Sequence, residues 1–297
     1  MAMSVATPTA HAAARHIPVA AARRLAASRS AAVAPARTAL LAPSGASRSR
    51  SSISRRSKHH GIVTAGWNDF TWGAGSVVSN TPASKDGGLH SIVLKVDNEM
   101  AKGYATPGQF CQLRTSDEGK PAFIAIASPP DADGTTFELL VKRQEGTAGE
   151  ICDMAGGDTI QMSPPMGPGF DMNKAPADQF PDTLLFATGS GISPIRALIK
   201  SGALAGRNVT LYYGTAAPSY TAFIDEFKEW EAAGVTVKHV QSQVGGPPTY
   251  VQDAIDTKDM DGAKTCAVLV GQKEMTTAVI EALEGAGVAK ERCIMNF

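Results

Sequence analysis

A glycine turn between two apolar segments is the part of this sequence whose residue types suit a chemical task. The turn and the positions after it are Gly189, Ser190, Gly191, Ile192, Ser193 and Pro194. The apolar run at 183–187 predicts a buried strand, while Ser193 and Pro194 suit the N-cap and the first position of a helix. The free N–H groups and positive dipole end of that helix would suit a pyrophosphate. A turn that only reverses the chain is the alternative, and it stays open at this point.

The segment before this turn, residues 66–170, has the pattern of a small antiparallel β-barrel. Short apolar stretches lie at 91–97, 109–114, 122–127, 136–142 and 159–162, separated by Gly, Pro, Asn and Asp. Spacing and breakers of this kind predict a barrel, with one short helix at about 147–154. Residues 171–182 have the composition of a linker.

From residue 183 to residue 297 the pattern changes to strands and helices in alternation. Strands are predicted at 183–188, 208–213, 235–241, 265–270 and 292–295, and helices at 193–202, 219–233, 248–256 and 273–286. This order predicts a five-stranded parallel sheet with helices on both faces. Ligands of such sheets bind at the carboxyl ends of the strands, so the glycine turn would place a ligand between the two domains.

The first sixty residues differ from the rest of the chain in charge. They hold ten of the 28 basic residues and no acidic residue, and they are rich in Ala, Ser and Arg. This composition predicts an organelle transit peptide at residues 1–65, cleaved near Val63, Thr64 and Ala65. We expect the chloroplast stroma, with the mitochondrion as the alternative. A basic tail is the other interpretation of this segment, but we expect no nucleic-acid partner.

The other 237 residues carry 18 basic and 28 acidic side chains, a net charge of −10. The four cysteines are Cys111, Cys152, Cys266 and Cys293, and their spacing matches no zinc or iron–sulfur motif, so we expect reduced core thiols and no metal. Every window of about 18 residues is interrupted by charged or polar side chains, so we expect no integral membrane protein.

Six motifs in order resemble those of the ferredoxin–NADP reductase superfamily of flavin- and nicotinamide-dependent reductases. The resemblance covers residues 67–297. The motifs are Pro107-Gly-Gln-Phe-Cys-Gln-Leu113, Gly146-Thr147-Ala148, Gly157-Asp-Thr-Ile160 with Pro164-Pro-Met-Gly-Pro-Gly-Phe170, Tyr212-Tyr-Gly-Thr215, Tyr250-Val-Gln-Asp253 and Val270-Gly271-Gln272-Lys-Glu-Met275. A match of all six motifs in this order is hard to explain by chance.

The resemblance implies FAD and NAD(P)H as cofactors and no acid–base catalytic residue. In this family a hydride passes between the nicotinamide and the flavin, and the protein holds the two rings in contact. The implied FAD contacts are Ala125, Ile126, Ala127, Ser128, Gly146, Thr147 and Ala148. The implied NAD(P) contacts are Gly189, Ser190, Gly191, Ile192, Ser193, Pro194, Ser242, Tyr250, Gly271, Gln272 and Met275. The C-terminal Phe297 is either a ring stacked on the flavin face or an apolar plug on the last strand.

The sequence departs from the family in its flavin motif, Arg-x-Tyr-Ser. Ala122 stands at the arginine and Ile124 at the tyrosine, so the phosphate-pairing cation and the stacking ring are absent. Loss of a charge-assisted contact of about 1.5–3 kcal/mol lowers affinity by about one to two orders of magnitude. Nearby replacements for the cation are Lys120, Lys142 and Arg143. The alternative is that this strand serves only as barrel core.

Two further departures concern the nicotinamide side. Val270 replaces the cysteine of plant-type enzymes, and Met295 stands about where relatives have a glutamate. Both changes argue against efficient plant-type hydride transfer.

The choice of nucleotide depends on Gln243, which follows Ser242 where relatives that prefer NADPH have an arginine. A glutamine cannot match the charge of a 2′-phosphate, so the sequence slightly favours NADH, or little discrimination. Tyr250 would stack on adenine or serve as the aromatic cap of a helix.

The function that these observations predict is flavin-dependent hydride transfer from NAD(P)H to FAD, with electrons passed to an unidentified acceptor. A net charge of −10 argues against acidic ferredoxin as that acceptor. The alternatives are a flavin-free or weakly flavin-binding nucleotide sensor, and a subunit of a larger complex with the same fold.

Overall fold

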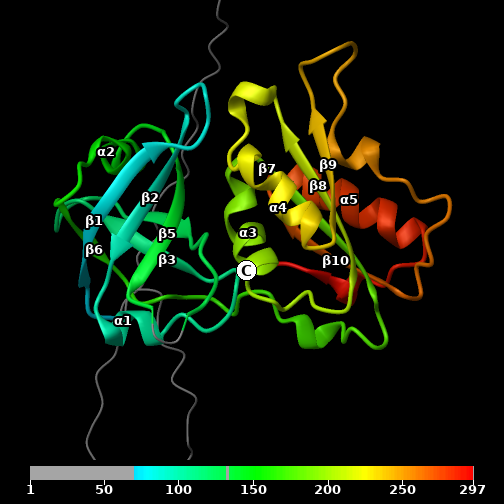
Figure 1. Cartoon of the computed structure of the whole chain (residues 1–297), viewed down its shortest axis with the longest axis horizontal. Helices are drawn as coiled ribbons and strands as arrows, with labels where there is room; N and C mark the ends of the chain where they lie inside the picture. Colours follow the sequence, from blue (N-terminus) through cyan, green and yellow to red (C-terminus); the bar gives the residue numbers. More distant parts are fainter. Residues whose placement is uncertain (1–69, 132–133, 297) are drawn as a thin grey trace, which may run out of the picture. The chain divides into compact units, whose positions relative to one another are not determined.

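The computed structural model describes residues 70–131 and 134–296. The predicted transit peptide at 1–65 and the C-terminal Phe297 lie outside the described residues. Figure 1 shows two groups of strands, an antiparallel barrel and a parallel sheet with its helices.

The barrel is built from the first six strands and two short helices. They are β1 (Gly73–Pro82), β2 (Leu89–Lys95), α1 (Asn98–Lys102), β3 (Phe110–Arg114), β4 (Ala122–Ala125), β5 (Thr136–Lys142), α2 (Thr147–Asp153) and β6 (Thr159–Met162). The strand order is β4-β3-β6-β1-β2-β5, and a bridge between Ile126 and Leu139 brings the two edges together. The predicted barrel is confirmed. The sequence does not predict β1, because its Gly, Ser and Asn residues hide the alternation of its buried positions.

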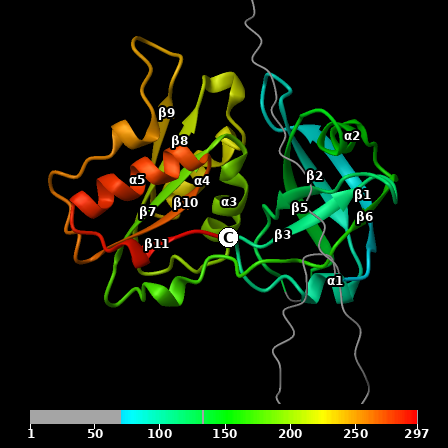
Figure 2. The same cartoon turned by 180° about the vertical axis from the view of Figure 1, so that it is seen from behind.

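The second group of strands forms the predicted five-stranded parallel sheet. Its elements are β7 (Asp182–Thr188), α3 (Ile192–Lys200), β8 (Asn208–Thr215), α4 (Phe227–Ala232), β9 (Val235–Gln241), β10 (Thr265–Val270), α5 (Lys273–Gly285) and β11 (Cys293–Ile294). The strand order is β11-β10-β7-β8-β9. Leu185 and Ala187 belong to the apolar cluster with α3 and α4, whereas Phe186 belongs to the cluster with α5. Helices therefore cover both faces, with α3 and α4 in front in Figure 1 and α5 in front in Figure 2.

Six 3₁₀ turns connect these elements. They are Met172–Lys174, Gly189–Gly191, Pro218–Tyr220, Ile224–Glu226, Val251–Ala254 and Lys290–Arg292. Two predicted helices are therefore wrong in extent. The helix predicted at 219–233 is interrupted at Phe223, whose φ of 56° is left-handed, and only α4 is a regular helix. The helix predicted at 248–256 shrinks to the single turn at Val251–Ala254.

The barrel and the sheet domain share part of one apolar core. Leu89 from β2 and Leu140 from β5 belong to the same buried cluster as Ile195 of α3 and Tyr213 of β8. All four cysteines are free and buried, as predicted. The described residues include no metal-binding cluster of His, Cys, Asp and Glu, and none of their helices is long and apolar enough to cross a membrane.

Candidate functional site

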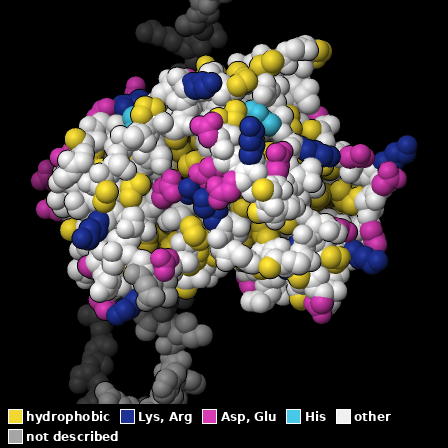
Figure 3. Space-filling model, viewed as in Figure 1, with side chains coloured by type: hydrophobic (Ala, Val, Ile, Leu, Met, Phe, Trp, Pro, Cys, Tyr) yellow, Lys and Arg dark blue, Asp and Glu magenta, His cyan; other side chains and the backbone are white. Residues whose placement is uncertain are grey.

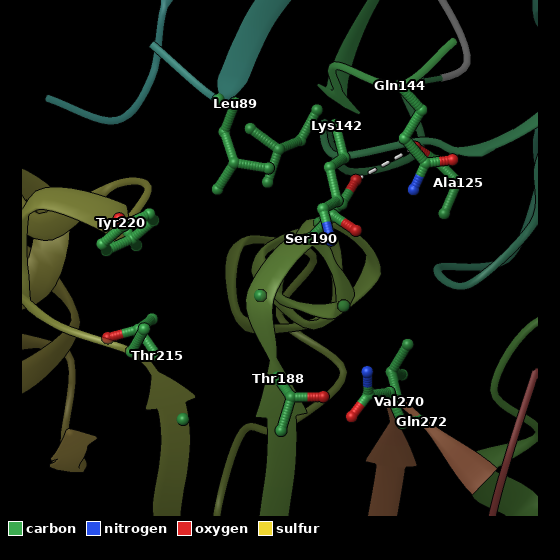
Figure 4. Close-up of a pocket in the computed structure, with 18 of the residues that line it drawn as sticks. Leu89, Ala125, Lys142, Gln144, Thr188, Ser190, Thr215, Tyr220, Val270 and Gln272 are labelled. Atoms are coloured by element: carbon green, nitrogen blue, oxygen red, sulfur yellow. Dashed lines mark hydrogen bonds between the residues drawn. The ribbon is translucent and has the colours of Figure 1, made fainter. Parts of the chain in front are cut away.

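A cavity of about 1090 Å³ opens at the carboxyl ends of the parallel strands. Its sheet side is formed by the residues at the ends of β7, β8, β9 and β10, and its barrel side by β4 and the end of β5. Figure 4 shows Ser190 of the glycine turn near the middle, with Thr215 and Tyr220 on one side and Val270 and Gln272 on the other. A cavity at this edge of a parallel sheet is where doubly wound proteins bind nucleotides.

The glycine turn presents bare backbone to this cavity. Gly189 has a φ of 53°, and a Cβ built there would meet no atom within 4 Å. Gly191 is packed tightly, because a Cβ there would come within 2.6 Å of the carbonyl oxygen of Val270. The turn runs directly into α3, where the backbone N–H of Ile192 bonds to the carbonyl oxygens of Gly189 and Ser190. The N–H groups at the start of this combined helical segment are therefore those of the glycine turn itself. The turn has free space on the cavity side at Gly189 and is packed against the Val270 carbonyl group at Gly191. A turn of this shape fits a pyrophosphate.

Ser193 has a different role from the predicted one. The helix begins at Ile192 and its N-cap is Gly191, so the N-cap prediction for Ser193 is wrong. The Ser193 hydroxyl instead donates to the carbonyl oxygen of Ala125 at 3.0 Å. This bond ties the start of α3 directly to the barrel strand β4, which Figure 4 draws as a dashed line.

A buried ionic network holds α3 against the barrel one turn farther along. The Arg196 guanidinium lies 2.7 Å from a carboxylate oxygen of Glu138 in β5 and 2.8 Å from one of Glu226. It also donates to the carbonyl oxygen of Ala127 at 3.1 Å. Burial alone would raise the pKa of Glu226, but Arg196, with help from Lys200, lowers it. Figure 3 shows acidic and basic side chains gathered where the barrel meets the sheet domain.

The barrel side of the cavity is an apolar wall made by Ala122, Phe123, Ile124, Ala125 and Leu140. The Phe123 side chain is exposed, and its ring centre lies 5.9 Å from that of Phe110. Such a wall fits a flat aromatic ring system such as a flavin by apolar contact alone. It offers no aromatic ring at Ile124 to stack on it.

Two cations follow this wall at the end of β5, and only one is free. Arg143 pairs with Asp153 at 2.7 Å and donates to the carbonyl oxygen of Cys152 at 3.2 Å. Lys142 is exposed and has no ion pair within the described residues. Figure 4 shows Lys142 among the residues that line the cavity. The residues present therefore fit a flavin ring and leave one cation, Lys142, for phosphate.

Neutral side chains line the end of the cavity near β8 and β9. Tyr220 and Tyr250 have exposed rings there, and Thr215 and Ser242 contribute hydroxyl groups. His239 Nε2 lies 2.8 Å from Thr215 Oγ1, and burial lowers the pKa of His239. A neutral imidazole therefore orients the Thr215 hydroxyl near pH 7.

Comparisons with known proteins agree with this geometry. The family model of the oxidoreductase NAD-binding domain matches residues 185–281. The chain is 30% identical over 245 residues to the fruit protein pKIWI502 of Actinidia deliciosa, covering 76% of this chain and 77% of that protein. The chain belongs to the ferredoxin–NADP reductase superfamily. The resemblance that its motifs indicated is therefore confirmed.

A second relative supports membership of this superfamily, and a solved structure shares its fold. A ferredoxin reductase component of 3-ketosteroid-9-alpha-monooxygenase from Rhodococcus rhodochrous is 30% identical over 213 residues, which is 68% of this chain and 58% of that protein. A ferredoxin NADP⁺ reductase from Neisseria gonorrhoeae, solved with bound FAD and NADP, has a TM-score of 0.64 at 17% identity. That match covers 75% of this chain and 97% of the other, and it shows a shared fold.

The cavity of this superfamily member gathers most of the residues that the resemblance assigned to NAD(P). Those that line it are Gly189, Ser190, Gly191, Ser193, Pro194, Ser242, Tyr250, Gly271 and Gln272. Ile192 is buried in the core, and Met275 is buried behind Gly271. Tyr250 is the N-cap residue of the turn at Val251–Ala254 and its ring is exposed, so the cap role is observed and stacking on adenine stays a prediction.

The predicted FAD residues divide in the same way. Ala125 and Ala148 line the cavity, whereas Ile126 and Ala127 are buried and Gly146 lies outside the lining. The Ser128 hydroxyl accepts the backbone N–H of Glu138 at 3.1 Å. The Thr147 hydroxyl donates to the carbonyl oxygen of Lys120 at 2.7 Å. These two hydroxyl groups therefore stabilise the barrel.

Sequence reasoning misses several lining residues that come from elsewhere in the fold, among them three with polar side chains. Asp86 lies in the loop between β1 and β2, Tyr220 in a 3₁₀ turn after β8, and Gln144 after β5. None belongs to a recognisable motif, and only the tertiary structure brings them to the cavity. The sequence offers one signal near them, the two basic residues Lys142 and Arg143 that directly precede Gln144 at the end of a predicted strand.

Proposed function

We propose that this chain is a flavin-dependent oxidoreductase that takes a hydride from NAD(P)H and passes electrons to an acceptor still to be identified. One observation carries this proposal: the open glycine turn and the apolar wall from Ala122 to Ala125 border the same cavity. A pyridine nucleotide on the turn and an aromatic ring on the wall would then lie within reach of each other.

The chain's own residues have three tasks in this reaction. The backbone N–H groups of the turn at 189–191, with the positive dipole end of α3 behind them, bind the nucleotide pyrophosphate. Gly271 and Gln272, at the end of β10, flank the nicotinamide. The bond from Ser193 to Ala125 keeps the nucleotide turn and the flavin wall at a fixed separation. A bound flavin would supply the redox chemistry, and the apolar wall would exclude water from it.

The preferred nucleotide and the electron acceptor belong to the same proposal. NADH is slightly favoured, because Gln243 follows Ser242 and offers no positive charge to a 2′-phosphate. Ferredoxin is disfavoured as the acceptor, because residues 61–297 carry a net charge of −10 and both partners would be acidic.

An absorption spectrum of the purified full-length chain tests the proposal. A yellow protein that releases stoichiometric FAD on heating, and whose colour bleaches under nitrogen with NADH or NADPH, would support it. The variant Gly189→Val separates nucleotide binding from flavin binding, because its side chain would fill the open side of the turn. This variant should keep its flavin and lose bleaching by nucleotide.

A second candidate function is a nucleotide sensor without flavin. The apolar Ala122 and Ile124, and the engagement of Arg143 by Asp153, favour this candidate. It predicts a colourless protein that binds a pyridine nucleotide and takes up no added FAD. A complex subunit would instead co-purify with partner chains and show no diaphorase activity.

We also propose that residues 1–65 direct the chain to the chloroplast. The support is compositional, since the first sixty residues contain ten basic and no acidic side chains. Residues 1–70 fused to a fluorescent reporter should enter the chloroplast stroma. Import into mitochondria would establish the alternative compartment.

A further inference from the structure

One carboxylate lines the cavity in the part of the chain that the structure describes, and it belongs to the barrel. This is Asp86, in the loop between β1 and β2. Its backbone N–H donates to the carbonyl oxygen of Ser219 at 3.0 Å, directly before Tyr220. Asp86 therefore lies at the end of the cavity that Tyr220 and Thr215 border in Figure 4.

The structure holds this carboxylate in one position. The Ser84 hydroxyl donates to Asp86 Oδ1 at 2.5 Å and accepts the backbone N–H of Leu89 at 3.0 Å. Ser84 is itself buried, and Leu89 is anchored in the core of the sheet domain. A Cβ at Gly88 would come within 2.6 Å of Asp86 Oδ2, so the glycine leaves room for the carboxylate. A charge held in place loses little conformational entropy when it binds a ligand.

The direction of the bound nucleotide decides which of its groups reaches this end of the cavity. With its pyrophosphate on the glycine turn and its nicotinamide beside Gly271 and Gln272, the adenosine points the other way, toward Thr215 and Tyr220. The side chains of β8 and β9 at this end are neutral, and the two lining cations are Lys142, the last residue of β5, and Arg143, directly after it. A carboxylate accepts hydrogen bonds from ribose hydroxyl groups and repels a phosphate.

We propose that Asp86 is a specificity-determining residue that accepts a hydrogen bond from the adenosine ribose of NADH and excludes the 2′-phosphate of NADPH. This inference rests on the proposed function and specifies NADH as its nucleotide. The nucleotide-binding sheet provides no acidic residue at the cavity in the described part of the chain, and the barrel loop supplies one in its place.

Calorimetric titration of the full-length chain with NADH and with NADPH tests this inference without reference to flavin. Asp86→Asn keeps the shape of the side chain and an acceptor for Ser84. It should weaken NADH binding about tenfold and leave NADPH binding equal or tighter, because one charge-assisted hydrogen bond and one repulsion are lost. Ser84→Ala should shift the ratio of the two dissociation constants in the same direction by a smaller factor.

The control is Asp178→Asn, the same chemical change at an exposed residue outside the cavity. It should leave both dissociation constants unchanged. A wild-type preference for NADPH, or a ratio that changes by less than about twofold in Asp86→Asn, would overturn the assignment of Asp86 alone. If the wild-type chain binds neither nucleotide, the proposed function fails, and this inference fails with it.

Discussion

The Arg196 guanidinium of α3 lies 2.7 Å from the Glu138 carboxylate of β5, and only 7% of the arginine side chain is exposed. The two residues are 58 positions apart and belong to different domains. Since Arg196 also pairs with Glu226, one guanidinium bridges two carboxylates at the junction between barrel and sheet. Removal of the cation leaves the Glu138 carboxylate with a hydrogen bond from the Ser91 hydroxyl and the Glu226 carboxylate with Lys200, and both stay largely shielded from water.

We therefore expect Arg196→Ala to lower the free energy of unfolding by about 3–5 kcal/mol, the usual cost of breaking a buried ion pair from one side. Urea titration followed by fluorescence measures this change. Lys102→Ala, which removes an exposed pair with Glu99, should leave the unfolding midpoint almost unchanged. An equal response of the two variants would contradict a structural role for the network.

The two glycines of the nucleotide turn should respond differently to alanine. Gly191→Ala places a methyl group within 2.6 Å of the Val270 carbonyl oxygen, so the turn must shift and the fold should lose stability. Gly189→Ala meets no protein atom within 4 Å and should cost only about 1–2 kcal/mol, because of its left-handed backbone. Thermal unfolding measures the difference in stability between the two variants. Titration with NADH should show weaker binding in both variants.

Lys142→Gln should weaken the binding of a phosphate-containing ligand by about tenfold, since a charged hydrogen bond is lost. The loss should shrink as salt is added, because the interaction of an exposed charge is screened. Arg143→Gln is the comparison, and its effect should be smaller because Asp153 already engages Arg143. A larger effect at Arg143 would mean that its pair with Asp153 opens when the ligand binds.

Gln243→Arg should raise the affinity for NADPH relative to NADH. Gln243 is exposed directly after Ser242, and its backbone N–H is held by the carbonyl oxygen of Ala216 at 2.8 Å. An arginine on this anchored backbone can form a charge-assisted bond with a 2′-phosphate. Titrations with the two nucleotides measure the ratio. An unchanged ratio would show that the adenosine lies elsewhere.

The half-buried His239 should make stability depend on pH. Burial lowers its pKa in the folded chain below the ordinary value of 6.5, so the unfolded chain binds the proton more tightly. The stabilisation is complete above about pH 6.5 and is lost as the pH falls through the folded pKa. His239→Gln should flatten the profile between about pH 7.5 and pH 5.5 relative to wild type. A slope that persists in the variant would assign the effect to other groups.

The strands and the nucleotide turn could be predicted because local residue pattern decides them. The apolar run ending at Ala187 and the glycines at 189 and 191 carry the signals of a buried strand and a tight turn in the chain itself. The same holds for α5, predicted at 273–286 and observed at Lys273–Gly285.

The rest depends on contacts between distant segments. Nothing near Ser193 in the sequence indicates that its hydroxyl would bond to Ala125 instead of capping its own helix. The break at Phe223 requires a left-handed backbone that a bulky residue rarely adopts, and the ring is held there under the Arg196 guanidinium. The position of Asp86 depends on β1, the strand that the sequence pattern does not predict.

The shared apolar core has a consequence for how this fold can be divided. Leu89 and Leu140 of the barrel complete the apolar core around Ile195 and Tyr213. A cut in the segment 171–182 would therefore expose apolar core surface on both fragments. A chimera that joins this sheet to the barrel of another reductase would have to bring the β1–β2 hairpin and β5 along with the sheet. We therefore expect the two halves to be exchangeable only as one piece.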